Sequence, residues 1–259
     1  MPYRYETHLH TCETSACGVA AAKEYIPAYQ DLGYHGIFVT DHFFGGNTAV
    51  SQHLPWREQV DQFCAGYEAA LNEGVRRGFQ VLFGWEQAFD GDEYLVYGLD
   101  KAWLYDHPEV KRWSRAEQFT QARRYGGCVV QAHPFRNRSY IRRIHLNTAY
   151  VDGVEVYNTA NPLEVNVQAY RYAKNLGLPM LAGTDIHSLP WPSYAGVAFE
   201  TPLHDAQDFA ARVRSHAPIT LLAPVEQLAD APVSPVMLPC EVLGEGGAVL
   251  HTPLSALLA

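Results

Sequence analysis

Short apolar runs alternate with longer amphipathic stretches along most of the chain. The run Gly-Ile-Phe-Val-Thr at residues 36–40 is a typical example of the short kind. The predicted strands span residues 3–7, 36–40, 80–84, 94–99, 128–132, 153–157, 179–182 and 196–200. Strands that alternate with helices in this way are typical of α/β folds with parallel strands.

Helices are predicted between these strands, from apolar residues spaced three or four apart and from boundary signals. Ser114 and Glu117 form a capping-box pattern, while Pro162 and Gly177 flank another amphipathic stretch. The predicted helices span residues 19–32, 55–77, 114–125, 162–176 and 205–216. This alternation predicts a barrel of the βα type, with an open doubly wound sheet as the alternative. In both folds, ligands bind beyond the carboxyl ends of the strands.

The pattern changes near residue 223. Residues 223–259 are rich in proline and glycine and carry only short apolar runs. They predict a strand-and-loop appendage packed on a barrel core of about residues 3–222, so residues 1–259 are expected to form one domain. A length of 259 residues by itself also allows two small domains.

Composition removes several classes of protein. A hydrophobic fraction of 47% excludes intrinsic disorder, and a net charge of −9 argues against a broad basic face for nucleic acids. No apolar run approaches the roughly 18 residues of a membrane span, and the first residues do not resemble a signal peptide. The five cysteines are odd in number and scattered, which predicts free thiols and a cytoplasmic location. Nothing in the pattern indicates an oligomeric state.

The chain has 12 histidines, and several of them directly follow predicted strands together with carboxylates. His8 and His10 are two residues apart, as are Asp185 and His187, so each pair points to one side. The candidates at strand ends are His8, His10, Asp41, His42, Glu86, His133, Glu155, Asn158, Asp185 and His187. Chance would scatter such residues over both strand ends, so the pattern predicts a polynuclear metal site at the barrel mouth. The other seven histidines are interpreted as ordinary surface or helix-end residues.

The order of these motifs resembles a known family. His-x-His-Thr, Thr-Asp-His, Gly-x-Glu, His-Pro, Glu-x-x-Asn and Asp-x-His follow one another over roughly residues 3–200. This set is similar to the PHP (polymerase and histidinol phosphatase) family of metal-dependent phosphoesterases. The resemblance implies a distorted (β/α)7, TIM-like barrel with two or three divalent ions (zinc, manganese or iron).

The resemblance also implies roles for individual residues. One metal would be held by His8, His10, Glu86 and Asp185. Glu86 would bridge to a second metal held by His133, and His42 and His187 would hold a third. Asp41 and Glu155 are expected to support ligands rather than to bind metal, since ligand imidazoles need their second nitrogen fixed.

Two positions depart from the family pattern. Cys17 stands where an aspartate is usual, so it is either a thiolate ligand of the third metal or a buried free thiol. A histidine is often supplied after the bridging glutamate, but the segment from Asp92 to Gly98 has none. Either Glu93 or Asp92 replaces it, or the second metal has a more open coordination shell.

Arg136, three residues after His133, is a candidate phosphate-binding donor, although an ion pair with a nearby carboxylate would explain it equally well. Residues 136–143 also contain the one locally basic run of the sequence. The expected function is hydrolysis of a small phosphomonoester or nucleotide by a metal-activated water, with Glu86, Asp185 and Arg136 as catalytic residues. The alternatives are an amidohydrolase-type metal hydrolase and a non-catalytic metal-binding module.

Overall fold

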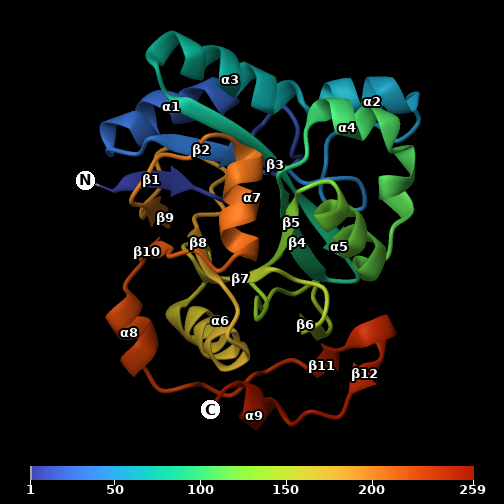
Figure 1. Cartoon of the computed structure of the whole chain (residues 1–259), viewed down its shortest axis with the longest axis vertical. Helices are drawn as coiled ribbons and strands as arrows, with labels where there is room; N and C mark the ends of the chain where they lie inside the picture. The colour runs from blue at the N-terminus through green and yellow to red at the C-terminus, as the bar shows by residue number, and fades with distance from the viewer. Residues whose placement is uncertain (1) are drawn as a thin grey trace.

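The protein is described by a computed structural model that covers residues 2–259. Nine strands form one sheet in the order β10-β9-β1-β2-β3-β4-β5-β7-β8, and β12-β11-β6 form a second, small sheet (Figure 1). The strands are β1 (Tyr3–Glu6), β2 (Gly36–Val39), β3 (Gln80–Phe89), β4 (Asp92–Tyr97), β5 (Cys128–Ala132), β6 (Ile144–Asn147), β7 (Gly153–Asn158), β8 (Met180–Gly183), β9 (Gly196–Phe199), β10 (Thr220–Leu222), β11 (Cys240–Leu243) and β12 (Val249–Leu250).

The large sheet curls into a nearly closed barrel. The gap is bridged between the segments that follow β1 and β8, where the amide of Asp185 donates to the carbonyl of His8 (2.9 Å) and the amide of His10 donates to the carbonyl of Ile186 (3.0 Å). The barrel-like α/β fold that the sequence predicted is therefore confirmed.

Helices surround this barrel, with α1 and α3 along one flank and α6 along another (Figure 1). The α-helices are α1 (Ala22–Asp31), α2 (Trp56–Phe63), α3 (Ala65–Arg77), α4 (Lys101–Asp106), α5 (Arg115–Arg124), α6 (Leu163–Leu176), α7 (Ala206–Arg214), α8 (Val225–Asp230) and α9 (Leu254–Leu257). The capping box at the start of α5 is present, since the Ser114 hydroxyl accepts from the amide of Glu117 (3.3 Å). Gly177 ends α6 in the left-handed conformation, as its position predicts.

An aromatic core fills the barrel interior and leaves only one end for a site. Phe209 of α7 packs against Phe38 of β2 and Tyr97 of β4, with ring centroids 4.6 and 4.9 Å apart. This cluster also contains Tyr5, Leu82, Leu95, Val130 and Val197 from other strands. Because α7 covers this end, the opposite rim, where β1, β2, β5, β7 and β8 end, is the one available to ligands.

The prediction of an all-parallel sheet is wrong for β4 and β9. β4 runs antiparallel to both β3 and β5, and β9 is antiparallel to β1 and β10. β3 and β4 are joined by the two-residue turn Asp90-Gly91, where Gly91 has φ of 94°. Asp-Gly between apolar segments is a strong hairpin signal, so the sequence did contain this information.

The predicted helix over residues 55–77 is wrong as one continuous element. It divides at Cys64 into α2 and α3. Gly66 in the first turn of α3 lies so close to the loop after β1 that an added Cβ would be 2.1 Å from Thr11 Oγ1 and 2.9 Å from Asp41 Oδ2. The new helix direction thus brings the α3 backbone against the loop that carries the candidate ligands.

Residues 223–259 contain more regular structure than predicted. They form α8, β11, β12 and α9, and β11 pairs in parallel with β6 in the connection between β5 and β7. Val242 and Leu257 are buried in the same apolar cluster as Tyr172 of α6. The segment therefore shares a core with the barrel.

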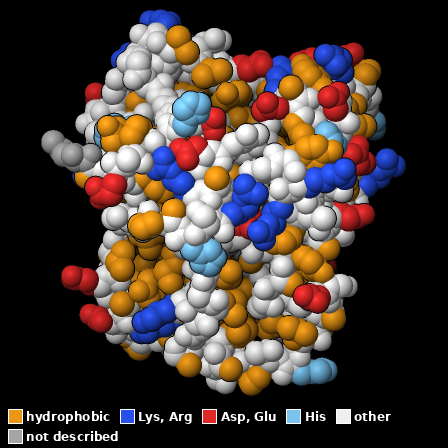
Figure 2. Space-filling view, viewed as in Figure 1, with side chains coloured by type: hydrophobic (Ala, Val, Ile, Leu, Met, Phe, Trp, Pro, Cys, Tyr) orange, Lys and Arg blue, Asp and Glu red, His pale blue; other side chains and the backbone are white. Residues whose placement is uncertain are grey.

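Charged side chains of both signs are interspersed over the face that Figure 2 presents. Within residues 2–259, no helix has the length and apolar character that crossing a membrane requires. All five cysteines belong to the described part of the chain and are free thiols.

Candidate metal centre

The strand ends bring five histidines and three carboxylates to one rim of the barrel. They come from the ends of β1, β2, β5 and β8, from within β3, and from the start of β4. The side chains are His8, His10, His42, His133, His187, Glu86, Glu93 and Asp185. Side chains distant in sequence therefore meet here, as the strand-end argument predicted.

His8 and His10 lie at the centre of the group. Their Nε2 atoms are 3.1 Å apart, and Asp185 Oδ1 lies 3.1 Å from His10 Nε2 and 3.5 Å from His8 Nε2. Both imidazoles are completely buried. Two ring nitrogens that face each other at this distance need a cation or a shared proton between them.

Glu86 connects the two sides of the site. Its Oε1 lies 3.0 Å from His133 Nε2 and 3.2 Å from His8 Nε2, while its Oε2 lies 2.8 Å from His42 Nδ1. The prediction that Glu86 lies just beyond its strand is wrong, because β3 continues to Phe89 and pairs with β4. This longer strand places Glu86 inside the rim, where one carboxylate can reach both groups of imidazoles.

The structure distinguishes Glu93 from Asp92, the two carboxylates predicted as possible replacements for a histidine after Glu86. Glu93 points into the site, with its carboxylate 3.6 Å from His133 and 3.9 Å from His42. Asp92, on the other face of β4, pairs with Arg115 and accepts from the Tyr94 hydroxyl at 2.5 Å. Since β4 is antiparallel, its first residues lie at the same rim as the ends of the parallel strands.

A second layer of side chains holds the imidazoles. Glu155 accepts from Nδ1 of His8 (2.9 Å) and from the amide of His133 (3.1 Å). Asp41 acts through Ser15, whose hydroxyl donates to Asp41 Oδ1 (2.6 Å) and lies 3.2 Å from Nδ1 of His10. Both expected supports are therefore beside the site, although Asp41 reaches His10 only through Ser15. Such contacts fix the ring orientation of metal ligands.

Backbone strain is also concentrated here. His133 and Asp185 have positive φ values of 27° and 56°, which residues other than glycine seldom adopt. Close packing accompanies the strain, because a Cβ on Gly183 would lie 2.6 Å from the Cβ of His8. Strained residues that persist in a well-packed structure often belong to functional sites.

The electrostatics favour bound cations. Burial opposes protonation of His8, but Glu155 and Glu86 raise the pKa of His8 to about 10. Burial likewise opposes protonation of His42, and Glu86 raises its pKa to about 10. Carboxylates that hold protons this firmly on neighbouring imidazoles also attract metal ions, and a metal that binds must displace those protons.

The donor set fits divalent metal ions. Four overlapping groups place their ligand atoms within 4.8 Å of one another: His8–His10–Asp185, His8–Glu86–His133, His10–His42–His187 and His42–Glu86–Glu93. Glu86 Oε2, Asp185 Oδ1 and His42 Nδ1 are buried and make no well-aligned hydrogen bond to a described residue, although Glu86 Oε2 and His42 Nδ1 are only 2.8 Å apart. Imidazole nitrogens and carboxylate oxygens are suitable ligands for zinc, iron and manganese. Metal binding by these residues stays a prediction.

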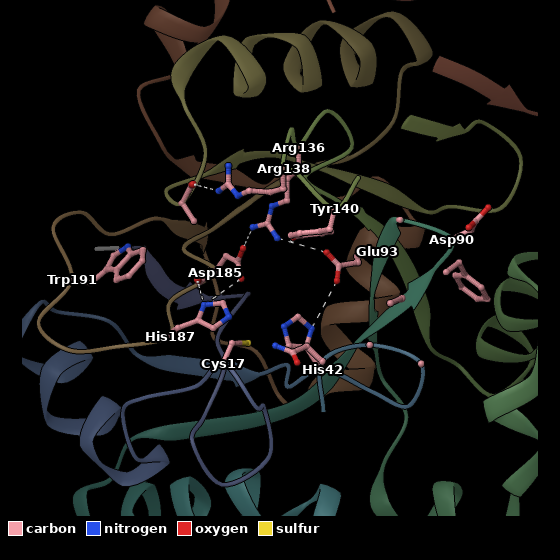
Figure 3. A pocket seen from close by; sticks show the side chains of 17 residues that line it. Cys17, His42, Asp90, Glu93, Arg136, Arg138, Tyr140, Asp185, His187 and Trp191 are labelled. Carbon is pink, nitrogen blue, oxygen red and sulfur yellow. Dashed lines mark hydrogen bonds and ion pairs between the residues drawn. The ribbon is translucent and has the colours of Figure 1, made fainter. Parts of the chain in front are cut away.

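Cys17 is adjacent to these groups without being a member of them. Burial would raise its pKa, but hydrogen bonds with His187 and His42 lower the pKa of the Cys17 thiol to about 6. His187 donates through Nδ1 to the carbonyl of Asp185 (2.7 Å), which leaves Nε2 for Cys17 or for a metal ion. Cys17, His42 and His187 line one side of the cleft in Figure 3. A thiolate ligand and an unligated thiol both remain compatible with this position.

A cleft of about 940 Å³ opens above the candidate ligands. Arg136 is buried beside it, forms an ion pair with Asp185 and lies 3.6 Å from Glu93 (Figure 3). The ion-pair interpretation of Arg136 is therefore correct, and a role in phosphate binding stays a prediction. Ser15 and Trp191 were not identified from the sequence, because no motif marks a single serine or a loop tryptophan.

Comparison with known proteins adds evidence for the fold. No family model matches the chain, and no curated protein matches it. A solved structure from Bacteroides vulgatus, described as a two-domain protein containing a predicted PHP-like metal-dependent phosphoesterase, superposes with a TM-score of 0.58 at 13% identity. That match covers 85% of this chain and 64% of the other, so this chain spans less than two thirds of that protein. PsfC from Pseudomonas syringae superposes with a TM-score of 0.56 at 16% identity, covering 88% and 94%. The resemblance predicted from the motifs is thus confirmed at the level of the fold, a distorted TIM-like barrel.

Proposed function

We propose that this protein is a metal-dependent phosphoesterase that hydrolyses a small phosphomonoester or nucleotide with a metal-activated water. The observation that carries the proposal is the convergence of five imidazoles and three carboxylates, three of whose buried atoms make no well-aligned hydrogen bond to a described residue. The barrel shared with a PHP-like phosphoesterase supports it. A cytoplasmic location, inferred from free cysteines, belongs to the same proposal.

Two or three divalent ions held by His8, His10, Glu86, His133, Asp185, His42 and His187 would supply hydroxide near neutral pH and offset phosphate charge. Glu93 and Cys17 are further candidate ligands, at opposite sides of this set. The protein residues then have distinct tasks. Glu86 and Asp185 would hold the metal ions in position. Glu155 and Ser15 orient the imidazoles of His8 and His10.

Arg136 is proposed to bind the phosphate. Its guanidinium lies at the cleft, and its buried Nε has no hydrogen-bond partner within residues 2–259. A planar guanidinium can donate two parallel hydrogen bonds to a phosphate, and a phosphate would compete with Asp185 for this donor. The substrate's negative charge would thus meet cations at the floor and at the wall of the cleft, despite the net charge of −9.

An amidohydrolase-type reaction is the alternative. Enzymes of that type would need a bridging group such as a carboxylated lysine. Lys101 pairs with Asp61 and Glu68, and none of the four lysines lines the cleft. Glu86 is suited to the bridging position instead, which favours the phosphoesterase.

The test combines metal analysis with an activity assay. The purified protein is expected to contain divalent metal by elemental analysis and to hydrolyse a chromogenic phosphomonoester when manganese, zinc or iron(II) is supplied. A phosphodiester, an amide and a lactone serve as comparison substrates. A protein that retains no metal and cleaves no phosphate ester would overturn the proposal, while cleavage of the amide or lactone alone would favour the alternative.

A further inference from the structure

The cleft above the candidate metal centre is much larger than one phosphate group requires. Its volume of about 940 Å³ falls at the upper end of the roughly 300–1,000 Å³ typical of small-molecule sites. If the phosphate is held at the floor, most of this space remains for the group that leaves. The walls of the cleft should therefore reveal the chemistry of the leaving group.

One wall is built on the turn that follows β7. The indole Nε1 of Trp191 donates to Thr159 Oγ1 at 2.8 Å, and Arg138 Nη2 donates to the carbonyl of Ala160 at 2.8 Å. Thr159 and Ala160 are consecutive residues, so one turn fixes both side chains. Trp191, Arg138 and Ala160 all line the cleft, and Trp191 lies on the same side as His187 and Asp185 (Figure 3).

The anchoring of Trp191 determines what it can offer a ligand. Its single hydrogen-bond donor is already used, and Thr159 in turn donates to the carbonyl of Thr184 (3.0 Å), next to Asp185. The indole also packs against an apolar cluster that contains Leu9 and Ile186. What remains towards the cleft is aromatic surface, held in place before any ligand arrives. A rigid ring and a planar guanidinium are both suited to stack on another flat ring.

We propose that Trp191 and Arg138 form a subsite for a planar aromatic or heteroaromatic leaving group of the phosphate ester. This inference rests on the proposed function and narrows its substrate class. In the reaction, water attacks phosphorus and the bond from phosphorus to the ester oxygen breaks. The products are inorganic phosphate and an alcohol that takes up the proton, and the ring stays on Trp191 until the alcohol departs.

Two substrates separate stacking from leaving-group reactivity. Benzyl phosphate and cyclohexylmethyl phosphate both release a primary alcohol, but only the first carries a flat ring. The wild-type protein is expected to prefer benzyl phosphate by about 5-fold in kcat/KM. Trp191→Leu should bring the two substrates to equal kcat/KM, mainly by lowering the value for benzyl phosphate. Trp191→Phe, which keeps a ring, should retain a preference.

Trp113→Leu is the matched control, because Trp113 does not line the cleft. It should keep the wild-type ratio between the two substrates. If the wild-type protein hydrolyses both esters equally well, or if Trp191→Leu keeps the full preference, the subsite is wrong while the proposed function stands.

A binding measurement distinguishes failure of the subsite from failure of the proposed function. Benzylphosphonate and cyclohexylmethylphosphonate cannot be hydrolysed, and their dissociation constants can be measured by calorimetry on the metal-loaded protein. If neither ester is cleaved but benzylphosphonate binds about 5-fold more tightly, and Trp191→Leu abolishes that difference, the subsite stands and the esterase activity does not. Equal binding of the two phosphonates to the wild-type protein would contradict the subsite.

Discussion

Asp92 and Glu93 are neighbours on β4, but they differ in their hydrogen-bond partners and in the direction of their pKa shifts. Asp92 is fully engaged, by Arg115 and by the hydroxyl of Tyr94. Although burial opposes it, these partners lower the pKa of Asp92 to about 2. Glu93 faces the cleft, where burial and the nearby Glu86 carboxylate raise its pKa. Adjacent residues on one strand thus have pKa shifts of opposite sign.

The contrast shows how to separate structural from functional charges in this barrel. Loss of a buried carboxylate whose oxygens are paired destabilises the fold, because its partner charge is left buried and unpaired, and such a carboxylate has no capacity left for a ligand. Glu86 and Asp185 each have a buried oxygen that lies close to imidazoles without a well-aligned hydrogen bond, which is the arrangement expected where a metal ion completes the contacts. The rule can be tested by changing residues on each side of the division.

The largest effect is expected for Glu86→Gln. The amide keeps the shape of the side chain but removes the charge that lies between two groups of imidazoles. We expect kcat/KM for a phosphomonoester to fall on the order of 10³-fold, with less metal retained after dialysis. Steady-state kinetics and elemental analysis of the same sample measure both. Full activity together with full metal content would show that Glu86 is not at the reacting centre.

Glu93→Gln and Asp92→Asn test the comparison directly. We expect Glu93→Gln to lower kcat/KM by about 100-fold with little change in the urea midpoint, because Glu93 has no strong partner to lose. Asp92→Asn should do the reverse, lowering stability while kcat/KM of the folded protein stays within about 3-fold, since Arg115 would lose its partner. If both variants lose activity equally, the assignment of Glu93 to the site and of Asp92 to the stability of the fold is wrong.

Much of the fold and most of the site could be predicted from the sequence, for identifiable reasons. Strands such as β2 and β8 are short, continuous apolar runs, and a ligand directly after such a run must lie at the rim. His8, His10, His42, His133 and Asp185 all follow strands in this way. The prediction needed only local patterns and the common direction of the parallel strands.

The remaining features depend on contacts that local patterns do not encode. Glu93 comes at the start of a strand, so it reaches the rim only because β4 runs antiparallel. Ser15 is one serine among several, and its role arises from contact with Asp41, 26 residues away. β6 is only four residues long and pairs with β11, about a hundred residues further along the chain. Turn geometry and long-range pairing supply this information.

The ion pair between Asp92 and Arg115 should make the free energy of unfolding depend on pH. The pKa of Asp92 is about 2 in the folded protein and 3.8 ordinarily, so its stabilising effect is present above about pH 4 and is lost as pH falls towards 2. The full effect is about 2 kcal/mol, of which roughly half is lost by pH 3. Urea unfolding of the wild type and Arg115→Met at pH 6 and pH 3 measures it. The variant should be less stable at pH 6, and the gap between the two proteins should narrow at pH 3. A gap of constant size would mean that the Asp92–Arg115 pair does not control the titration.

The smallest effect is expected for Ser15, which contacts the candidate ligand His10 but is not itself a candidate ligand. Ser15→Ala removes the hydroxyl that joins Asp41 to His10 and accepts from the amide of His42 (3.0 Å). We expect about a 10-fold loss of metal affinity, measured by competition with a chelator, because His10 would lose its orientation. Ser114→Ala is the matched control. It removes a helix cap from α5, so it should cost about 1 kcal/mol in unfolding free energy and leave metal affinity unchanged. If Ser15→Ala changes only stability, as Ser114→Ala should, then Ser15 supports the fold and does not orient the candidate ligands.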